Sequence, residues 1–371
     1  MTRQPSMIRV LIVDDEPPAR TRLRRQLETV PGVTVVGEAD SAAGARNLVT
    51  LERPDVLFLD IEMPEMRGTA LAASLPEPRP FVVFATAYEH YALEAFGCDA
   101  TDYLLKPVSR TRLVATLDRI RDKMARRGEA ERDLAAATAL QADMWPGALP
   151  AVPGFDCAAA SLPARGVGGD FYDAFALEDG TWGLLLGDVS GKGMAAGLVA
   201  TAVQARVHTA ARHARLAPAA LAETLNADVF ASTQGQRYAT LVYGTLDPVL
   251  HRMRLVNAGH PAALLFAPGA AVPAALASSG PALGLLETAH FETLDATLPS
   301  GSAFVAFSDG VVEALDPDDV EFGAERVVAL VTSRRDAPAA DLCAALLEAV
   351  RRHRGSRQHQ DDVTIMVVKA A

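Results

Sequence analysis

Residues 8 to 107 alternate between short apolar runs and segments with helical spacing, and this alternation limits the possible folds most strongly. Repeated strand-then-helix units predict a parallel, doubly wound sheet, because each crossover brings the next strand in at the same edge. The sequence therefore predicts an α/β domain with a five-stranded parallel sheet. The expected strands are residues 8–13, 33–39, 56–59, 81–85 and 103–105.

Residues 109 to 145 carry almost no strand signal. Apolar residues step by four, three and four, which predicts an amphipathic helix that closes the first domain. They are Leu113, Leu117, Ile120 and Met124. We expect Arg127-Gly128 to interrupt this helix, so that residues 129–145 form a second one ended by Pro146. The predicted organisation is a first domain over 1–124, a helical linker over 125–150 and a second domain over 151–371.

The pattern changes from residue 151 onward. Short β runs are separated by Gly, Asp and Pro turns, which predicts antiparallel sheets in a mixed α/β domain. The expected helical stretches are 194–214, 218–231 and 338–354, and residues 363–369 form a last strand.

Composition limits the classes of function. The chain has 371 residues, half of them hydrophobic, so two folded domains are expected. Its net charge of −11 argues against a nucleic-acid-binding face, which needs clustered basic residues. No apolar run reaches the roughly 20 residues that span a bilayer, and residues 1–6 lack a signal-peptide layout. We therefore expect a cytoplasmic protein that binds neither membrane nor nucleic acid.

Four polar sites directly follow strand-like runs: Asp14-Asp15, Asp60, Thr86 and Lys106. In an open α/β sheet, ligands bind in the crevice at the carboxyl ends of the strands, so these residues are expected to meet. Three carboxylates together repel unless a cation such as Mg²⁺ lies among them. One carboxylate could then attack phosphorus, while Lys106 pairs with the phosphoryl group and Thr86 donates a hydrogen bond.

The segments LIVDDEPPAR, VLFLDIEMPEMRG, FATAYEHYALEAF and DYLLKPV resemble a response-regulator receiver domain, of flavodoxin-like fold, over about residues 7–124. The resemblance implies that Asp60 accepts a phosphoryl group from a histidine kinase. It implies a Mg²⁺ ion bound directly by Asp15, through water by Asp14, and by the backbone carbonyl of Glu62. The other implied roles are a switch pair, Thr86 and Tyr103, and a phosphoryl contact from Lys106, which precedes a cis Pro107.

A second acidic constellation begins at the segment FYDAFALEDGTWGLLLG, residues 171–187, which reads as a hairpin with its turn at 178–180. Asp170 then faces Asp188 or its neighbour within roughly 5–6 Å, which is destabilising unless a cation bridges them. Asp309 and Asp361-Asp362 also stand at strand edges. Four acidic sites could hold two Mg²⁺ or Mn²⁺ ions about 3.5–4 Å apart, which activate a water for phosphoryl displacement.

Six segments resemble, in order, the PPM-type serine/threonine phosphatases of the SpoIIE-like branch, over about residues 141–371. They are PARGVGGDFYD, GDVSGKGMAAGLVAT, NAGHPAALLF, AFSDGVVEAL, FGAERV and DDVTIMVV, and LQADMWP fits the family's linker helix. The resemblance implies a β-sandwich flanked by helices. It also implies a metal pair bound by Asp170, Asp188 with the Val189 carbonyl, Asp309 and Asp361. Gly166 departs from the family, where an acidic or amide residue is common.

Three weaker signals have simpler interpretations. Residues 168–171 resemble the GGDEF turn of diguanylate cyclases, but Phe171 stands where an acidic residue is expected. Gly191-Lys192-Gly193 lacks the spacing of a P-loop and is expected to form a tight turn before a helix. His260 could donate a proton, although a satisfied polar residue at a strand end is the favoured interpretation.

We predict that phosphorylation of Asp60 controls hydrolysis of phosphoserine or phosphothreonine on a partner protein. The resemblance implies a STAS-type anti-anti-sigma partner. We also expect a homodimer through the receiver and the 109–145 helices. The alternative is a non-enzymatic interaction protein, in which the receiver gates a domain that only sequesters its partner. Metal-dependent hydrolysis of an aryl phosphate distinguishes the two.

Overall fold

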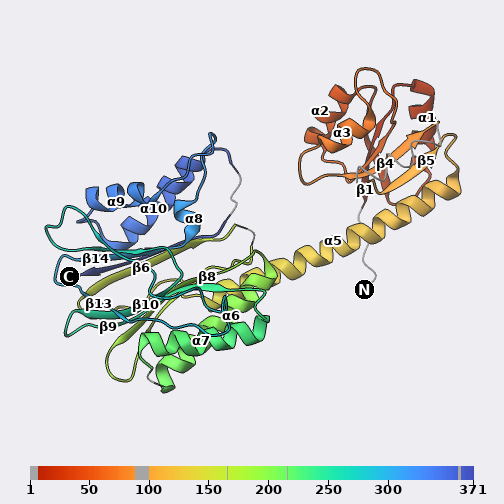
Figure 1. The fold of residues 1–371 in the computed structure, drawn as a ribbon. Helices are drawn as coiled ribbons and strands as arrows, with labels where there is room; N and C mark the ends of the chain where they lie inside the picture. The colour runs from red at the N-terminus through yellow and green to blue at the C-terminus, as the bar shows by residue number, and fades with distance from the viewer. Residues whose placement is uncertain (1–6, 88–99, 165, 215, 358–360) are drawn as a thin grey trace. The chain divides into compact units, whose positions relative to one another are not determined.

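The computed structural model describes residues 7–87, 100–164, 166–214, 216–357 and 361–371. The chain divides into two compact units, Met1–Glu131 and Arg132–Ala371 (Figure 1). Among the residues described, no helix is long and apolar enough to cross a membrane.

The first unit contains one parallel sheet with the strand order β2-β1-β3-β4-β5. This confirms the predicted five-stranded α/β fold. Its strands are β1 (Ile8–Val13), β2 (Val33–Ala39), β3 (Val56–Leu59), β4 (Phe81–Thr86) and β5 (Asp102–Leu105). Its helices are α1 (Pro17–Glu28), α2 (Ala42–Glu52), α3 (Gly68–Ala73) and the start of α5 (Arg110–Met144). Residues 88–99, between β4 and β5, lie outside the described residues and include most of the segment FATAYEHYALEAF.

Both faces of this sheet are buried, as expected of a parallel sheet covered by helices. Leu57 and Leu59 of β3 pack in the cluster that includes residues of α2 and α3. Phe58, between them, packs on the other face with Leu23 of α1 and Leu117 of α5. The unbroken apolar run of β3 reflects this double burial.

The expected interruption at Arg127-Gly128 is wrong, because α5 continues without a break from Arg110 to Met144. A glycine inside a helix costs only about 1 kcal/mol relative to alanine. Strong helix formers surround this one, and Arg127 Nε lies 3.1 Å from Glu131 Oε1 one turn later. The helix thus passes the boundary between the two units at residue 131.

The second unit contains two five-stranded antiparallel sheets, β13-β10-β9-β8-β7 and β12-β11-β14-β15-β6. The strands are β6 (Phe155–Leu162), β7 (Phe171–Ala176), β8 (Trp182–Val189), β9 (Ala239–Asp247), β10 (Arg252–Ala258), β11 (Ala263–Phe266), β12 (Ala274–Leu276), β13 (Leu294–Thr297), β14 (Ala303–Phe307) and β15 (Val363–Ala370). The helices are α6 (Met194–Thr209) with a π-helical end η2 (Ala210–Ala214), α7 (Pro218–Thr233), α8 (Asp309–Val312), α9 (Ala324–Ser333) and α10 (Ala339–Arg354).

The two sheets pack face to face, and helices cover their outer faces (Figure 1). Leu184 and Leu255 of one sheet meet Phe304 and Met366 of the other in a shared core. One outer core packs α6 and α7 against the first sheet, and another packs α9 and α10 against the second. This confirms the predicted sandwich flanked by helices.

Candidate functional site

The first site lies at the carboxyl ends of the parallel strands, where Lys106 lies between two carboxylates. Its Nζ is 2.5 Å from Asp60 Oδ2 and 2.7 Å from Asp14 Oδ2. Ligand oxygens of Asp14, Asp15 and Asp60 all lie within 4.8 Å of one another. No other trio of acidic, histidine or cysteine side chains is this tight in the described part of the chain. Oxygen ligands at this spacing suit a hard divalent cation such as Mg²⁺.

Burial and ion pairing act against each other here. Burial raises the pKa of Asp60, while the Lys106 ammonium lowers it, and the net direction is upward. Burial disfavours the charged form of Lys106, but hydrogen bonds with Asp14 and Asp60 outweigh it and raise the pKa of this lysine. A lysine held charged in this position can pair with a phosphoryl group.

Thr86 ends β4 and is 1% exposed. Its Oγ1 is buried and has no hydrogen-bond partner among the described residues. Buried hydroxyls are nearly always satisfied, so an orphaned one at a strand end fits a donor kept for a ligand. Tyr103 is half-buried in β5 and lies opposite Phe84 in the register. Its role as a switch residue stays a prediction.

Two supporting residues of this site were not singled out from the sequence. A Cβ at Gly68 would lie 2.0 Å from the carbonyl oxygen of Asp60, so only glycine fits there. The guanidinium of Arg20 donates to the carbonyl oxygens of Asp14 and Asp15 at 2.6 and 3.2 Å. The bond between Lys106 and Pro107 is cis, as the resemblance implied. The Glu62 N–H donates to Asp60 Oδ1 at 3.3 Å, and the metal contact of the Glu62 carbonyl stays a prediction.

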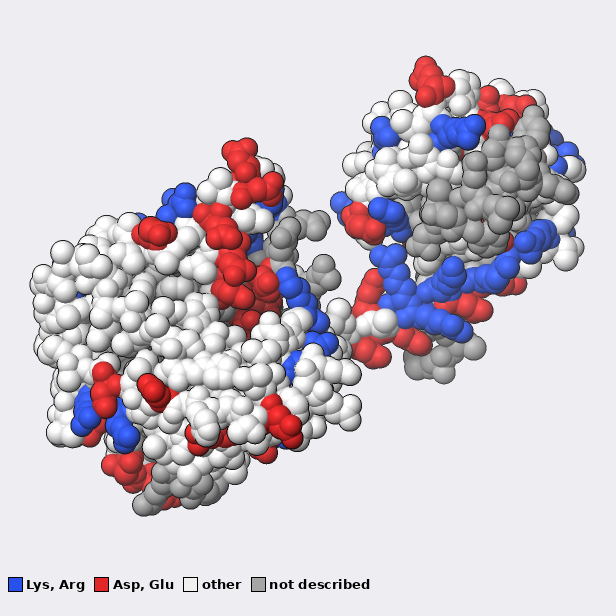
Figure 2. All heavy atoms as spheres, viewed as in Figure 1, with Lys and Arg blue, Asp and Glu red and all other residues white. Residues whose placement is uncertain are grey.

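The second site forms at one end of the sandwich. The register pairs Phe171 with Gly187, which confirms the predicted hairpin and leaves Asp170 and Asp188 next to it at the open end. Asp309 begins α8 two residues after the end of β14, and Asp361 lies two residues before the start of β15. Figure 2 shows acidic side chains gathered in a band on one face of this unit. The turns and strand ends thus bring together four carboxylates that are far apart in the sequence.

These carboxylates interact strongly when no cation separates them. Burial and the charge of Asp188 raise the pKa of Asp170 well above its ordinary value, and one Asp170 oxygen is buried without a described partner. Burial and the charge of Asp309 raise the pKa of Asp188 to about 7. Burial and the charge of Asp361 raise the pKa of Asp309. Divalent cations relieve such repulsion between carboxylates. These four carboxylates do not form a trio as tight as Asp14, Asp15 and Asp60 of the first site, and a more widely spaced set suits two cations.

Asp362 has a different role from the one that the resemblance implies for its neighbour Asp361. Its carboxylate accepts hydrogen bonds from the amides of Ala164 and Gly169, both at 2.7 Å. A Cβ at Gly168 would lie 2.6 Å from the same carboxylate, and one at Gly310 would lie 2.0 Å from the Asp362 carbonyl oxygen. Asp362 therefore binds the loop that carries Asp170 to the strand end that carries Asp361, and the two glycines leave room for this close approach.

The same loop is held from its other side by α5. The buried amide of Gln141 donates to the Gly168 carbonyl at 2.9 Å and accepts from the Gly168 N–H at 3.0 Å. Gly197 of α6 also approaches closely, since a Cβ there would lie 2.2 Å from Val167 and 2.9 Å from Gln141. The Val189 N–H donates to Gly169, while the predicted metal contact of the Val189 carbonyl stays a prediction.

His260 is a satisfied, buried residue. Burial lowers its pKa to about 4, so the ring is neutral near pH 7. Its Nε2 lies 3.0 Å from the carbonyl oxygen of Phe307, and its Nδ1 lies 2.7 Å from the hydroxyl of Thr240. The imidazole therefore connects β14, which precedes Asp309, with β9, which pairs with Asp188. The structure agrees with the interpretation of His260 as a satisfied polar residue.

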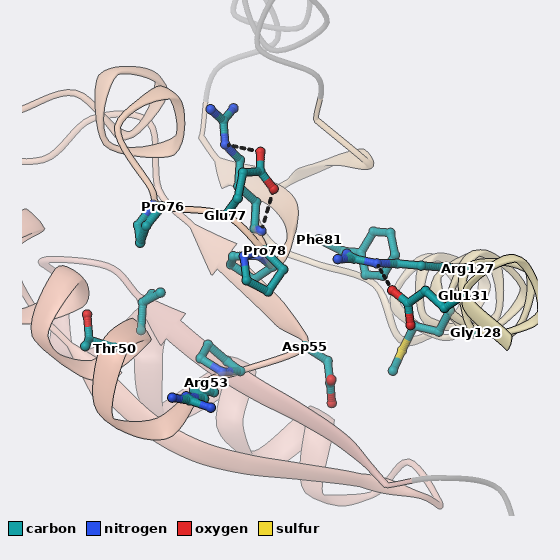
Figure 3. A pocket seen from close by; sticks show the side chains of 15 residues that line it. Thr50, Arg53, Asp55, Pro76, Glu77, Pro78, Phe81, Arg127, Gly128 and Glu131 are labelled. Atoms are coloured by element: carbon teal, nitrogen blue, oxygen red, sulfur yellow. Dashed lines mark hydrogen bonds and ion pairs between the residues drawn. The ribbon is translucent and has the colours of Figure 1, made fainter. Parts of the chain in front are cut away.

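A cavity of about 580 Å³ lies elsewhere in the first unit. Figure 3 shows that Asp55, Glu77, Phe81 and residues of α5 line it. Because Asp55 and Phe81 stand at the amino ends of β3 and β4, the cavity lies at the edge of the sheet opposite Asp60. It is not part of the carboxylate site.

Comparison with known proteins agrees with both domains. The family model for the response regulator receiver domain matches residues 10–118. The transcriptional regulatory protein BtsR of Salmonella typhi is 49% identical over 121 residues, which are 32% of this chain and 51% of that protein. The chain thus spans about half the length of the curated relatives it matches.

Solved structures match the second unit. The SiaA-PP2C domain of Pseudomonas aeruginosa has a TM-score of 0.57 at 18% identity, covering 66% of this chain and 98% of that one. The RsbU and RsbW domains of Rv1364c from Mycobacterium tuberculosis have a TM-score of 0.53 at 28% identity, covering 60% and 63%. The first of these likenesses shows the fold alone.

The family model for Stage II sporulation protein E (SpoIIE) matches residues 178–371, which is more than half of the chain. This range includes Asp188, Asp309 and Asp361 and most of both sheets. With a receiver domain ahead of a PPM-type phosphatase fold, the chain belongs to the SpoIIE family.

Proposed function

We propose that Asp60 is the phosphoacceptor of this response regulator and that a histidine kinase is its phosphoryl donor. An Asp60 carboxylate oxygen attacks phosphorus, the bond to the histidine nitrogen breaks, and an aspartyl phosphate forms. Mg²⁺, when bound by Asp14, Asp15, Asp60 and the Glu62 carbonyl, would supply positive charge to the phosphoryl oxygens. Lys106 holds a further oxygen as a point charge, and the orphaned Thr86 hydroxyl donates to another. That hydroxyl and the 2.5 Å contact between Lys106 and Asp60 carry the proposal.

We further propose that the second domain is a metal-dependent phosphatase for phosphoserine or phosphothreonine on a partner protein. Asp170, Asp188, Asp309 and Asp361, with the Val189 carbonyl, are the proposed ligands of two Mg²⁺ or Mn²⁺ ions. Such a pair, when bound, would supply an activated water and neutralise phosphoryl charge. Support comes most directly from the placement of Asp170 and Asp188 at the open end of one hairpin, where burial and then the charges of neighbouring carboxylates raise the pKa values of Asp170, Asp188 and Asp309.

The proposed substrate is a phosphorylated STAS-type anti-anti-sigma protein. Support comes from the family membership and from the order of the six motifs between residues 141 and 371. Dephosphorylation of such a partner would let it sequester an anti-sigma factor.

Control by the receiver is proposed to pass through α5. Its first part packs Leu113 and Leu117 into the receiver core, and its last turns hold Gly168 through Gln141. Gly168 is two residues from Asp170. A movement of the last turns of α5 would therefore displace a proposed metal ligand.

A homodimer is proposed as the working assembly. The second half of α5 exposes Leu134, Leu140 and Met144 by 40%, 64% and 45%. Apolar side chains on an exposed helix are typical of a surface that packs against a second helix. Sedimentation of the full chain with and without acetyl phosphate tests this assembly, and a monomer under both conditions would refute it.

One experiment tests the enzyme. Hydrolysis of p-nitrophenyl phosphate is measured with Mn²⁺, with a chelator, and with Asp188→Asn. We expect Mn²⁺-dependent turnover that the substitution abolishes. Equal rates in all three would favour the non-enzymatic, partner-sequestering alternative. Adding a phosphorylated STAS-type protein, with wild type and Asp60→Asn, then tests the substrate and the direction of control.

A further inference from the structure

Lys192 stands in the turn between β8 and α6, beside the carboxylates of the second domain. The turn is held firmly: the Ser190 carbonyl accepts from the Arg237 guanidinium at 2.7 Å, and the Tyr238 N–H donates to the Ser190 hydroxyl at 3.0 Å. Gly191 and Gly193 have φ values of +91° and +74°, which side chains with a Cβ rarely adopt. The backbone of Lys192 is therefore fixed at the rim of the site.

The ammonium group of Lys192 points to a proposed metal ligand. Its Nζ lies 2.9 Å from Asp361 Oδ2, and the two side chains are 43% and 46% exposed. Among the residues that the structure describes, no other basic side chain forms an ion pair with Asp170, Asp188, Asp309 or Asp361. The positive charge also opposes the burial and the Asp361 charge that raise the pKa of Asp309. Lys192 thus partly neutralises the carboxylate set in the absence of cations.

This ion pair competes with any cation that binds Asp361. Exposed ion pairs are weak and screened by solvent, whereas a divalent cation interacts more strongly with the same carboxylate. A cation on Asp361 would weaken the hold of this carboxylate on the ammonium, which stays near the site because its backbone is fixed. A phosphoryl group brought to this rim by the proposed phosphatase reaction would offer the ammonium a second anion.

We propose that Lys192 exchanges partners: it pairs with Asp361 in the metal-free site and binds the phosphoryl oxygens of the substrate when Asp361 holds a cation. This rests on the phosphatase function proposed above and adds a substrate-binding residue to it. The three donors of an ammonium group suit a phosphoryl group that gains charge on its leaving oxygen. Lys192 transfers no proton and forms no covalent bond in this role.

The exchange predicts two effects of opposite sign in Lys192→Met. Removing the competing ammonium should tighten Mn²⁺ binding to the metal-free protein by about two- to fivefold, the range of an exposed ion pair. Removing a charge-assisted hydrogen bond should weaken phosphoryl binding by about tenfold. A residue that only shapes the turn would weaken both.

The test uses the full chain. Calorimetry gives the Kd of Mn²⁺ for the metal-free protein and the Kd of inorganic phosphate for the Mn²⁺-loaded protein. Steady-state kinetics on p-nitrophenyl phosphate then separates KM from kcat. Lys192→Arg keeps the charge and should restore phosphate binding. Arg206→Met is the matched control, because Arg206 of α6 forms an ion pair with Asp228. The side chains of this pair are similarly exposed, by 38% and 49%.

Tighter Mn²⁺ binding together with weaker phosphate binding, relative to Arg206→Met, supports the exchange. Any other combination in Lys192→Met overturns it. If wild type hydrolyses no aryl phosphate, the proposed phosphatase function fails. The two calorimetric constants still decide the role of Lys192 in that case.

Discussion

The side-chain amide of Gln141 forms two hydrogen bonds with the backbone of Gly168, at 2.9 and 3.0 Å, and all four groups are buried. Because both the N–H and the C=O of Gly168 are bonded, the orientation of this loop residue is fixed as well as its distance from α5. The loop leads directly to Asp170. The end of α5 and a proposed metal ligand are therefore connected through the Gln141 side chain.

Gln141→Ala should uncouple the two domains. It leaves the N–H and C=O of Gly168 buried without partners, which costs about 1–3 kcal/mol for each group. We expect weaker Mn²⁺ binding and a phosphatase rate that no longer responds to acetyl phosphate. Asp143→Ala, an exposed position two residues further on, should respond as wild type does. A normal response in Gln141→Ala would contradict this connection.

Lys106→Met should destabilise the receiver and prevent its phosphorylation. The substitution leaves Asp14 and Asp60 buried without their shared cation, at a cost of about 3 kcal/mol or more. Urea denaturation of the full chain measures the loss, and mass spectrometry after acetyl phosphate treatment measures phosphorylation. Asp60→Asn should destabilise Lys106→Met less than it destabilises wild type, or even stabilise Lys106→Met, because in that background it removes an uncompensated charge. Equal effects in the two backgrounds would refute the coupling.

The metal-free second domain should lose stability as pH rises from about 4 to about 7. The pKa of Asp188 is raised from 3.8 to about 7, so the folded state binds more protons than the unfolded state in this window. The stability that protonated Asp188 contributes is thus fully present below about pH 4. It falls toward pH 7 by an amount on the order of 3 kcal/mol. Thermal unfolding in chelator, at several pH values, measures the slope.

Saturating Mn²⁺ should remove most of that slope, because ligand carboxylates bind metal in the deprotonated form. A pH-independent melting temperature in chelator would contradict the predicted protonation of Asp188.

Gly310→Ala should disrupt the second site while Gly147→Ala should not. A Cβ at position 310 would lie 2.0 Å from the Asp362 carbonyl oxygen, so the strand ends that carry Asp309 and Asp361 must separate. Overpacking of this kind costs about 1–3 kcal/mol. We expect a lower melting temperature and weaker Mn²⁺ binding. A Cβ at Gly147 meets nothing within 4 Å, so wild-type values are expected there.

Local patterns predicted the receiver well because its chemistry follows directly from strand ends. Asp60 comes immediately after β3 and Thr86 ends β4, and the parallel order of the strands places such residues together. The hairpin that brings Asp170 near Asp188 was equally readable, since its turn and its alternation lie within one short segment. In both cases the informative residues are close to each other in sequence or in strand order.

The remaining features depend on contacts between distant segments. Nothing near Gly310 shows that the backbone of Asp362 will lie against it, and nothing near Gln141 identifies Gly168 as its partner. The expected break at Gly128 failed for a related reason. Local glycine content favoured an interruption, whereas the strong helix formers on both sides and the Arg127–Glu131 pair outweigh its small cost.

The continuity of α5 has a consequence for how related chains can vary in length. Each added or deleted residue turns everything beyond it by about 100° around the helix axis. Leu117 is buried in the receiver core and Gln141 is buried against Gly168, so a change of length between them turns one of these side chains away from its partners unless the helix phase is kept. Between these two positions, insertions of about seven residues, close to two full turns, preserve the phase, and single-residue changes do not.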